Sequence, residues 1–130
     1  MQDCLSVFIP SVSENFSDAA IVLIGHGSTL NADSAAPTWQ HAEELRRRKM
    51  FAQVQEAFWK QEPYIWQAAR AVFAPRVFFV PLFISEGYFT EEVIPRELGF
   101  PPTPGSQLPL VEQRGEQIFH YCAPVGTHES

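Results

Sequence analysis

Ala19-Ala-Ile-Val-Leu-Ile-Gly-His-Gly-Ser-Thr29 is the stretch that decides the fold. Its apolar run from Ile21 to Ile24 fits a strand buried on both faces, which is typical of a parallel sheet. Gly25 and Gly27 then allow a tight turn and a close approach of the backbone to a ligand. His26 lies between them at the carboxyl end of the predicted strand, the edge at which open α/β sheets bind their ligands.

The familiar glycine motifs do not fit this turn. A dinucleotide fingerprint needs a third glycine, and position 30 is Leu30. A nucleophile elbow needs glycines two residues on either side of Ser28, and neither is present. A phosphohistidine enzyme of the Arg-His-Gly type needs an arginine where Gly25 stands. What remains is a single imidazole, His26, which can take up a proton near neutral pH or ligate cobalt, iron, nickel or zinc. We favour such a role over a neutral histidine satisfied by nearby backbone.

The composition predicts one globular domain of 130 residues, of which 45% are hydrophobic. A net charge of −6 argues against a nucleic-acid surface. The two cysteines form no metal-spaced pair, which suits a reducing compartment but leaves a disulfide between them open. Residues 1–18 lack the features of a signal peptide, and no apolar run approaches the ~20 residues that span a membrane. We therefore expect a cytoplasmic protein with no nucleic-acid and no membrane partner.

The chain alternates predicted strands and helices, which indicates a mostly parallel four-stranded sheet with right-handed crossovers. Phe51–Trp59 is ambiguous, and we favour a strand there because it preserves the alternation. The basic run Arg46–Lys49 is better explained as a solvated helix end than as a nucleic-acid patch. Residues 100–110 are rich in proline and predict a loop. The expected elements are strand Ala19–Ile24, helix Ala35–Lys49, strand Ala52–Phe58, helix Pro63–Phe73, strand Arg76–Ile84, helix Thr90–Leu98 and strand Gln117–Ala123.

The carboxyl ends of the first and third strands should be neighbours in such a sheet, so two loops should form one crevice. The crevice would hold an imidazole, hydroxyls, carboxylates and aromatic rings, and flat rings suit a flat ligand. Its expected members are His26, Ser28, Ser85, Glu86, Gly87, Tyr88, Phe89 and Glu92.

Four motifs in this order resemble the CbiX-type sirohydrochlorin chelatases, the small class II chelatases of cobalamin and siroheme synthesis. They are Gly25-His-Gly-Ser28, Val80-Pro-Leu-Phe83 followed by Gly87, Ile94-Pro95, and Pro124-Val-Gly-Thr-His128. The resemblance implies a flavodoxin-like α/β half-domain that inserts cobalt or iron into sirohydrochlorin, with the metal as substrate and no organic cofactor. Two halves are then expected to face each other, as a homodimer or a tandem duplication, with the tetrapyrrole between them.

The resemblance also implies roles for individual residues. His26 matches the first metal-binding histidine of the family, as a metal ligand or an acceptor of a pyrrole proton. Glu92 matches an acidic position before Ile-Pro and would be a second oxygen ligand or proton acceptor, although an acid in a helix's first turn needs no such role. The family's second histidine falls in a Gly-x-His pattern that here reads Gly87-Tyr88-Phe89. Ser28, Ser85, Gly87, Tyr88 and Phe89 are expected to contact the tetrapyrrole.

The expected organisation is an arm at residues 1–18 and a chelatase-like α/β domain at residues 19–130. We expect this domain to lack its final covering helix, as half of a longer duplicated protein or with a partner over that face.

Three functions remain open at this point: a chelatase half-domain, a non-catalytic tetrapyrrole-binding or dimerisation module that lacks the second histidine, and a flavodoxin-like binder of a phosphorylated or flavin ligand. The last rests on fold analogy alone.

Overall fold

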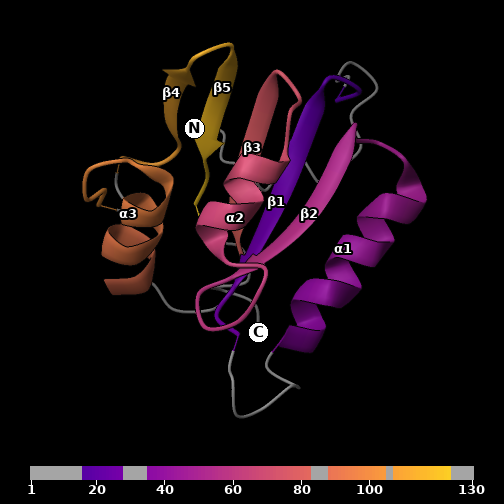
Figure 1. The fold of residues 1–130 in the computed structure, drawn as a ribbon, viewed down its shortest axis with the longest axis horizontal. Helices are drawn as coiled ribbons and strands as arrows, with labels where there is room; N and C mark the ends of the chain where they lie inside the picture. Colours follow the sequence, from indigo (N-terminus) through magenta and orange to yellow (C-terminus); the bar gives the residue numbers. More distant parts are fainter. Residues whose placement is uncertain (1–15, 28–34, 83–87, 105–106, 124–130) are drawn as a thin grey trace.

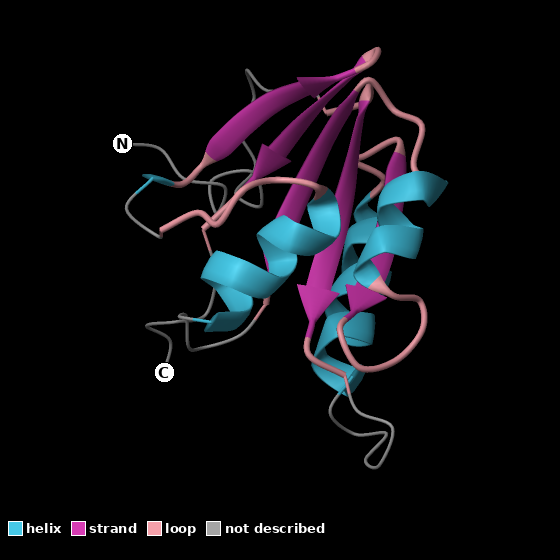
Figure 2. Ribbon diagram, turned by 60° about the vertical axis from the view of Figure 1, so that its left-hand side comes forward, coloured by secondary structure: helices cyan, strands magenta, loops and turns pink. Residues whose placement is uncertain are grey.

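The computed structural model describes residues 16–27, 35–82, 88–104 and 107–123, which form one sheet with helices on both of its faces (Figures 1 and 2). The elements are β1 Ala19–Gly25, α1 Ala36–Arg48, β2 Gln53–Phe58, α2 Ile65–Ala71, β3 Arg76–Pro81, the π-helix η3 Phe89–Val93, α3 Ile94–Leu98, β4 Leu110–Arg114 and β5 Gln117–Tyr121.

The sheet has the strand order β2-β1-β3-β5-β4. β1 pairs in parallel with both β2 and β3, β3 pairs in parallel with β5, and β4 is an antiparallel edge strand. The predicted α/β class and mostly parallel sheet are confirmed, and so is the neighbouring position of the first and third strands. Their register brings Ile24 beside Ala57 on one side and Pro81 on the other, so three strands end at the same edge.

The sheet has five strands rather than the predicted four. The additional strand, β4, is polar and mostly exposed, so it lacks the apolar pattern that marks a strand in sequence. Gly115, at φ +62°, makes the tight turn that joins β4 to β5. β4 therefore adds an edge hairpin and leaves the central parallel strands as predicted.

All three predicted helices differ at their ends, and α1 is one residue shorter than expected at each end. α2 begins at Ile65 because the Tyr64 N–H donates to Oε1 of Gln67 at 2.8 Å, and it ends before the extended residue Val72. The helix expected at Thr90–Leu98 begins one residue earlier and starts with a π-helical turn, η3. The predicted arm at residues 1–18 lies largely outside the described residues, as does the segment after residue 123.

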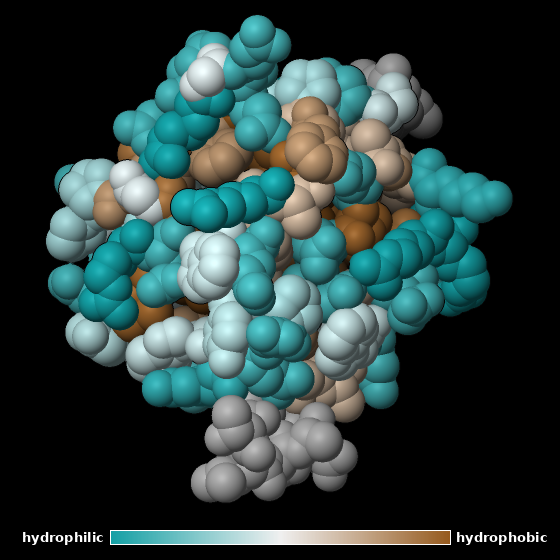
Figure 3. Space-filling model, in the orientation of Figure 1, coloured by the Kyte–Doolittle hydropathy of each residue, from teal (hydrophilic) through white to brown (hydrophobic). Residues whose placement is uncertain are grey.

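Alternate side chains of the sheet enter two apolar clusters. α2 and α3 pack over one face, where Val22 and Phe79 are fully buried. α1 packs over the other face against Ile21 and Leu23. In the view of Figure 3 the apolar surface shows in small areas between hydrophilic side chains. No helix within the described part of the chain is both long and apolar enough to cross a membrane.

His120 in β5 is half-buried. Its imidazole stacks on the ring of Phe78, with centroids 4.4 Å apart. Burial, with a smaller contribution from the Arg76 charge, lowers the pKa of His120 below its ordinary value. A neutral histidine is therefore part of the sheet's packing.

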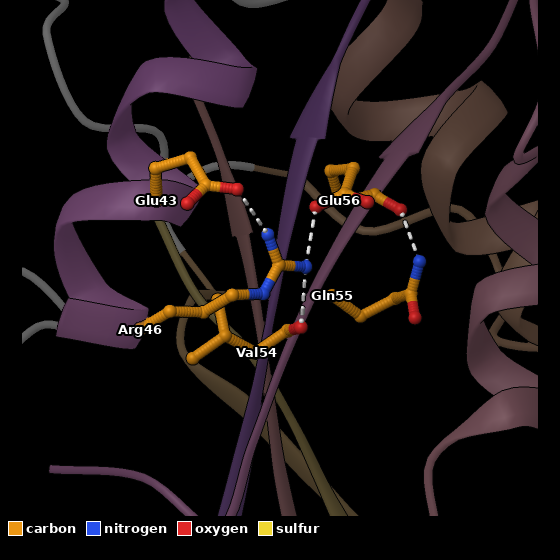
Figure 4. Close-up of polar contacts among 5 residues, drawn as sticks. All are labelled: Glu43, Arg46, Val54, Gln55 and Glu56. Carbon is orange, nitrogen blue, oxygen red and sulfur yellow. Dashed lines mark hydrogen bonds and ion pairs between the residues drawn. The ribbon is translucent and has the colours of Figure 1, made fainter. Parts of the chain in front are cut away.

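Arg46 anchors α1 to the sheet (Figure 4). Its guanidinium donates to the carboxylate of Glu56 at 2.7 Å, to the Val54 carbonyl at 2.9 Å and to Glu43 at 3.2 Å. Glu56 is buried, 7% exposed, whereas the Arg46 side chain is 37% exposed, so it is the carboxylate of this pair that is shielded from water. The predicted solvated helix end is therefore correct for Arg47 and Arg48, which are exposed, and only partly correct for Arg46, whose side chain is 37% exposed and also binds the buried Glu56.

Replacing Arg46 with alanine is expected to lower the free energy of unfolding by about 1–3 kcal/mol, because the Glu56 carboxylate would stay buried without its donor. Arg47→Ala is the control: its side chain is 72% exposed, and surface ion pairs contribute at most about 1 kcal/mol. Urea unfolding measures both variants. Equal losses would contradict the anchoring role.

Candidate functional site

His26 follows β1 on a turn that backbone hydrogen bonds hold on both sides. The Lys60 N–H donates to the His26 carbonyl at 2.9 Å, and the Trp59 N–H donates to the Gly25 carbonyl at 3.3 Å. On the other side, the Leu82 N–H donates to the Ile24 carbonyl at 2.8 Å. The segments after β2 and β3 thus fix the backbone from which the imidazole projects.

The two glycines around His26 are required by protein packing. A Cβ on Gly25 would overlap the Thr38 hydroxyl in the first turn of α1 and lie 3.3 Å from the Phe58 ring. Gly27 has φ +72°, and a Cβ there would lie 2.8 Å from Cγ of Gln61 and 2.9 Å from Cβ of Phe58. The close approach that the sequence assigned to a ligand is therefore made by side chains of the protein itself.

The imidazole of His26 is exposed, and one of its nitrogens is engaged. Nδ1 lies 3.0 Å from the Gly27 carbonyl oxygen. A carbonyl can only accept, so the contact is a hydrogen bond when Nδ1 carries a hydrogen, and in the neutral ring of that tautomer the lone pair is on Nε2. A neutral imidazole with this tautomer can bind a metal ion or accept a proton at Nε2.

Two aromatic rings, Trp59 and Phe89, lie against His26, and Tyr88 lies beside Trp59. We call these four residues the aromatic cluster: His26, Trp59, Tyr88 and Phe89. The His26 ring lies 5.1 Å from Trp59 and 5.4 Å from Phe89, centroid to centroid. Trp59 and Phe89 stack at 5.0 Å with an interplanar angle of 24°, and Tyr88 lies 6.5 Å from Trp59. Tyr88 is 61% exposed, so the cluster reaches the surface.

Trp59 is the member of the cluster that sequence reasoning missed. It directly follows β2, and Gly25 pairs with Phe58 at the end of that strand, so Trp59 lies at the sheet edge that carries His26. In a parallel sheet the residues that follow β2 are predicted to lie at the same edge as those that follow β1 and β3. That rule could have identified Trp59 from the sequence. Nζ of Lys60 lies 4.0 Å from the Trp59 ring centroid and adds a cation beside the cluster.

The structure brings three predicted site residues together: His26, Tyr88 and Phe89. Glu92 is exposed on η3, and within the described residues no hydrogen bond or ion pair joins it to His26. Four other expected members of the crevice lie outside the described residues: Ser28, Ser85, Glu86 and Gly87. In the part of the chain that is described, no three His, Cys, Asp or Glu side chains come close enough to hold a metal ion.

Comparison with known proteins matches residues 20–130 to the model of the CbiX family. The chain belongs to the CbiX family. The resemblance drawn from the four sequence motifs is thereby confirmed.

Two curated relatives share this part of the chain. The probable sirohydrochlorin cobaltochelatase of Halobacterium salinarum is 46% identical over 121 residues, which cover 85% of this chain and 41% of that protein. The sirohydrochlorin cobaltochelatase of Methanocaldococcus jannaschii is 36% identical over 84 residues, 62% of this chain and 58% of that protein. The chain thus spans less than two thirds of either relative.

A solved structure supports the fold. A multi-domain Deinococcus radiodurans protein, described as structurally similar to chelatases with two additional novel domains, matches with a TM-score of 0.77 and 40% identity. The match covers 85% of this chain and 25% of that protein. The chain therefore corresponds to one part of a larger protein in this comparison too.

Gly27→Ala is expected to be more destabilising than Gly115→Ala. Both positions have positive φ, and this conformation costs an alanine about 1–2 kcal/mol. A Cβ at Gly27 also overlaps Phe58 and Gln61, which adds about 1–3 kcal/mol of overpacking, whereas nothing lies within 4 Å of a Cβ at Gly115. Urea unfolding of both variants checks this, and equal losses would disprove the packing argument.

Proposed function

We propose that this domain inserts divalent cobalt into sirohydrochlorin, with the exposed His26 imidazole as metal ligand or proton acceptor. The observation that carries the proposal is the contact of Nδ1 with the Gly27 carbonyl, which leaves Nε2 as the basic nitrogen. Membership of the CbiX family and the names of two curated relatives support the choice of substrate and metal. Iron is the alternative metal.

Metal insertion requires that the pyrrole N–H protons leave and that the metal keep open coordination positions. His26 meets either need at Nε2, because that atom is unprotonated in the tautomer that Gly27 selects. Its backbone is held by Lys60, so the imidazole can move only through its own side-chain torsions. Glu92 is proposed as the second proton acceptor or oxygen ligand, and its exposed position on η3 leaves its carboxylate open to a substrate.

The aromatic cluster is proposed to receive the flat macrocycle. Trp59 and Phe89 are stacked, and Tyr88 beside them is largely exposed. Such rings stack on planar π-systems and exclude water from the reacting centre. Sirohydrochlorin carries many carboxylates, and the Lys60 ammonium over Trp59 is placed to attract one of them.

The first test is an absorbance time course of sirohydrochlorin mixed with Co²⁺ or Fe²⁺ and the native chain. His26→Ala is expected to lower the insertion rate by about 100-fold or more, the scale of a lost acid–base group. His41→Ala, an exposed histidine on α1, is the control and should keep the native rate. An unchanged rate in His26→Ala would overturn the proposed site.

We also propose that the tetrapyrrole lies between this domain and a second half, either another copy of the chain or a further part of a longer protein. The exposed face of the aromatic cluster supports this arrangement. The same assay tests it: a site shared by two copies gives a rate per molecule that rises with protein concentration, and a site completed by a further part of a longer protein gives no insertion by this chain alone. Insertion at a rate per molecule that is independent of concentration would show a self-contained site and overturn the proposal.

The second candidate function is a non-catalytic tetrapyrrole-binding or dimerisation module. Phe89 motivates it, because it stands where the family's second histidine is expected and its ring lies 5.4 Å from that of His26. In this case sirohydrochlorin changes its spectrum on binding, but the metal enters no faster than without protein. Fast insertion by the native chain would exclude this candidate.

Phe89→His is expected to tighten Co²⁺ binding, because a second imidazole would face His26 across the distance that now separates two rings. Phe89→Leu is the control that removes the aromatic ring without adding a ligand. Isothermal titration with Co²⁺ measures both. If Phe89→His and Phe89→Leu bind Co²⁺ equally, position 89 does not face the metal site.

A further inference from the structure

The π-helical turn η3 presents Phe89 to the aromatic cluster. In η3 the Ile94 N–H bonds to the Phe89 carbonyl, five residues earlier, rather than to the Thr90 carbonyl as in an α-helix. The regular α-helix resumes with α3 at Ile94. Such π turns are rare and need an identifiable cause.

Pro95 is part of that cause. In the π pattern, the donor to the Thr90 carbonyl would be the N–H of residue 95, and proline has none. The hydroxyl of Tyr121, in β5, donates to the Thr90 carbonyl instead, at 2.5 Å. The next carbonyl, that of Glu91, accepts from the Thr103 N–H at 2.9 Å. Donors from distant segments thus take both carbonyls at the point where η3 passes into α3.

The Tyr121 hydroxyl is suited to hold this register. Tyr121 is fully buried, and burial together with the charge of Glu91 raises the pKa of its hydroxyl, so it remains a donor. An α-helical register would bring the Ile94 N–H back to the Thr90 carbonyl, so that two donors would have to share an oxygen that the Tyr121 hydroxyl now approaches at 2.5 Å. Because weakening the hydrogen bond of a buried hydroxyl is costly, Tyr121 favours the π register, in which the bond is made without a competing helical donor.

We infer that Tyr121 is a positioning residue: its bond to Thr90 holds η3 in the π register and so sets the Phe89 ring against His26 and Trp59. A change to the α register would rotate the start of η3, including Phe89, about the helix axis by roughly one residue's turn, about 100°. Phe89 would then leave a cluster in which its centroid lies 5.0 Å from Trp59. The inference rests on the proposed function for the role of His26, but the ring placement is independent of it.

Tyr121→Phe removes the hydroxyl and keeps the ring. The ring-carbon and ring-proton NMR shifts of His26 and Trp59 are expected to change, because ring currents from Phe89 act on both. Phe119→Leu is the matched control, since Phe119 lies in the same strand, enters the same apolar cluster and packs its ring on Phe79 of β3. This control should lose stability but leave the His26 and Trp59 shifts as in the native chain.

A measurement on the native chain keeps the inference testable if Tyr121→Phe fails to fold. The bond to Thr90 predicts a slowly exchanging Tyr121 hydroxyl hydrogen, visible as a deuterium-isotope splitting of its Cζ resonance. A hydroxyl that exchanges rapidly with solvent would overturn the inference. So would a folded Tyr121→Phe variant with native His26 and Trp59 shifts.

The insertion assay separates this inference from the proposed function. If the native chain inserts metal, Tyr121→Phe should slow insertion by about tenfold or more, because a misplacement of about 1 Å can cost ~100-fold. If the native chain inserts no metal but the NMR shifts still move in Tyr121→Phe, the proposed reaction fails and the positioning role stands.

Discussion

The packing of Thr38 and Phe58 against the Cβ-free backbone of Gly25 is the constraint on which the rest of the structure depends. It lets the first turn of α1 approach the end of β1 more closely than any other residue would permit. Gly27, on the other side of His26, is packed in the same way, because Gln61 and Phe58 occupy the space that a side chain would need. Because His26 lies between these two glycines, core packing fixes its backbone. The site therefore needs no separate scaffold, because the contacts that close the fold also orient the imidazole.

The parallel sheet explains why the cluster draws on segments far apart in sequence. β2, β1 and β3 run in the same direction, so the residues that follow them emerge at one edge. His26 follows β1, Trp59 follows β2, and η3 carries Phe89 after β3. Lateral strand order, rather than any local motif, thus assembles an imidazole and stacked rings. The buried apolar residues of the sheet lie beneath this edge and support it, as the planar ligand of the proposed function would require.

The sequence predicted what depends on local pattern and missed what depends on lateral contacts. β1 was predicted because its seven residues are all buried and therefore read as a continuous run without polar side chains. The strand–helix alternation correctly identified the ambiguous segment of β2 as a strand. β4 was not predicted because an exposed edge strand has no apolar pattern in its sequence. Trp59 was not predicted as a site residue because its partners follow other strands. The π register of η3 was not predicted because it depends on the Tyr121 hydroxyl, which lies 31 residues after Thr90. Arg46 looked like a solvated cation because its buried partner is on a neighbouring strand.

The presence of phenylalanine at position 89 bears on how a metal ion would be handled in the proposed reaction. A chelatase must release the metal to the four nitrogens of its substrate, so a protein site that bound the ion tightly would compete with the product. A single imidazole leaves most coordination positions open to water and to the macrocycle. In the described residues His26 is the nitrogen donor of the aromatic cluster, and its neighbours there are rings that stack but do not ligate strongly. Such a site favours transfer of the metal ion to the macrocycle over tight binding of the ion by the protein. A second imidazole in the place of Phe89 would raise the ion's affinity for the protein and, with it, the free energy needed to pass the metal to the macrocycle.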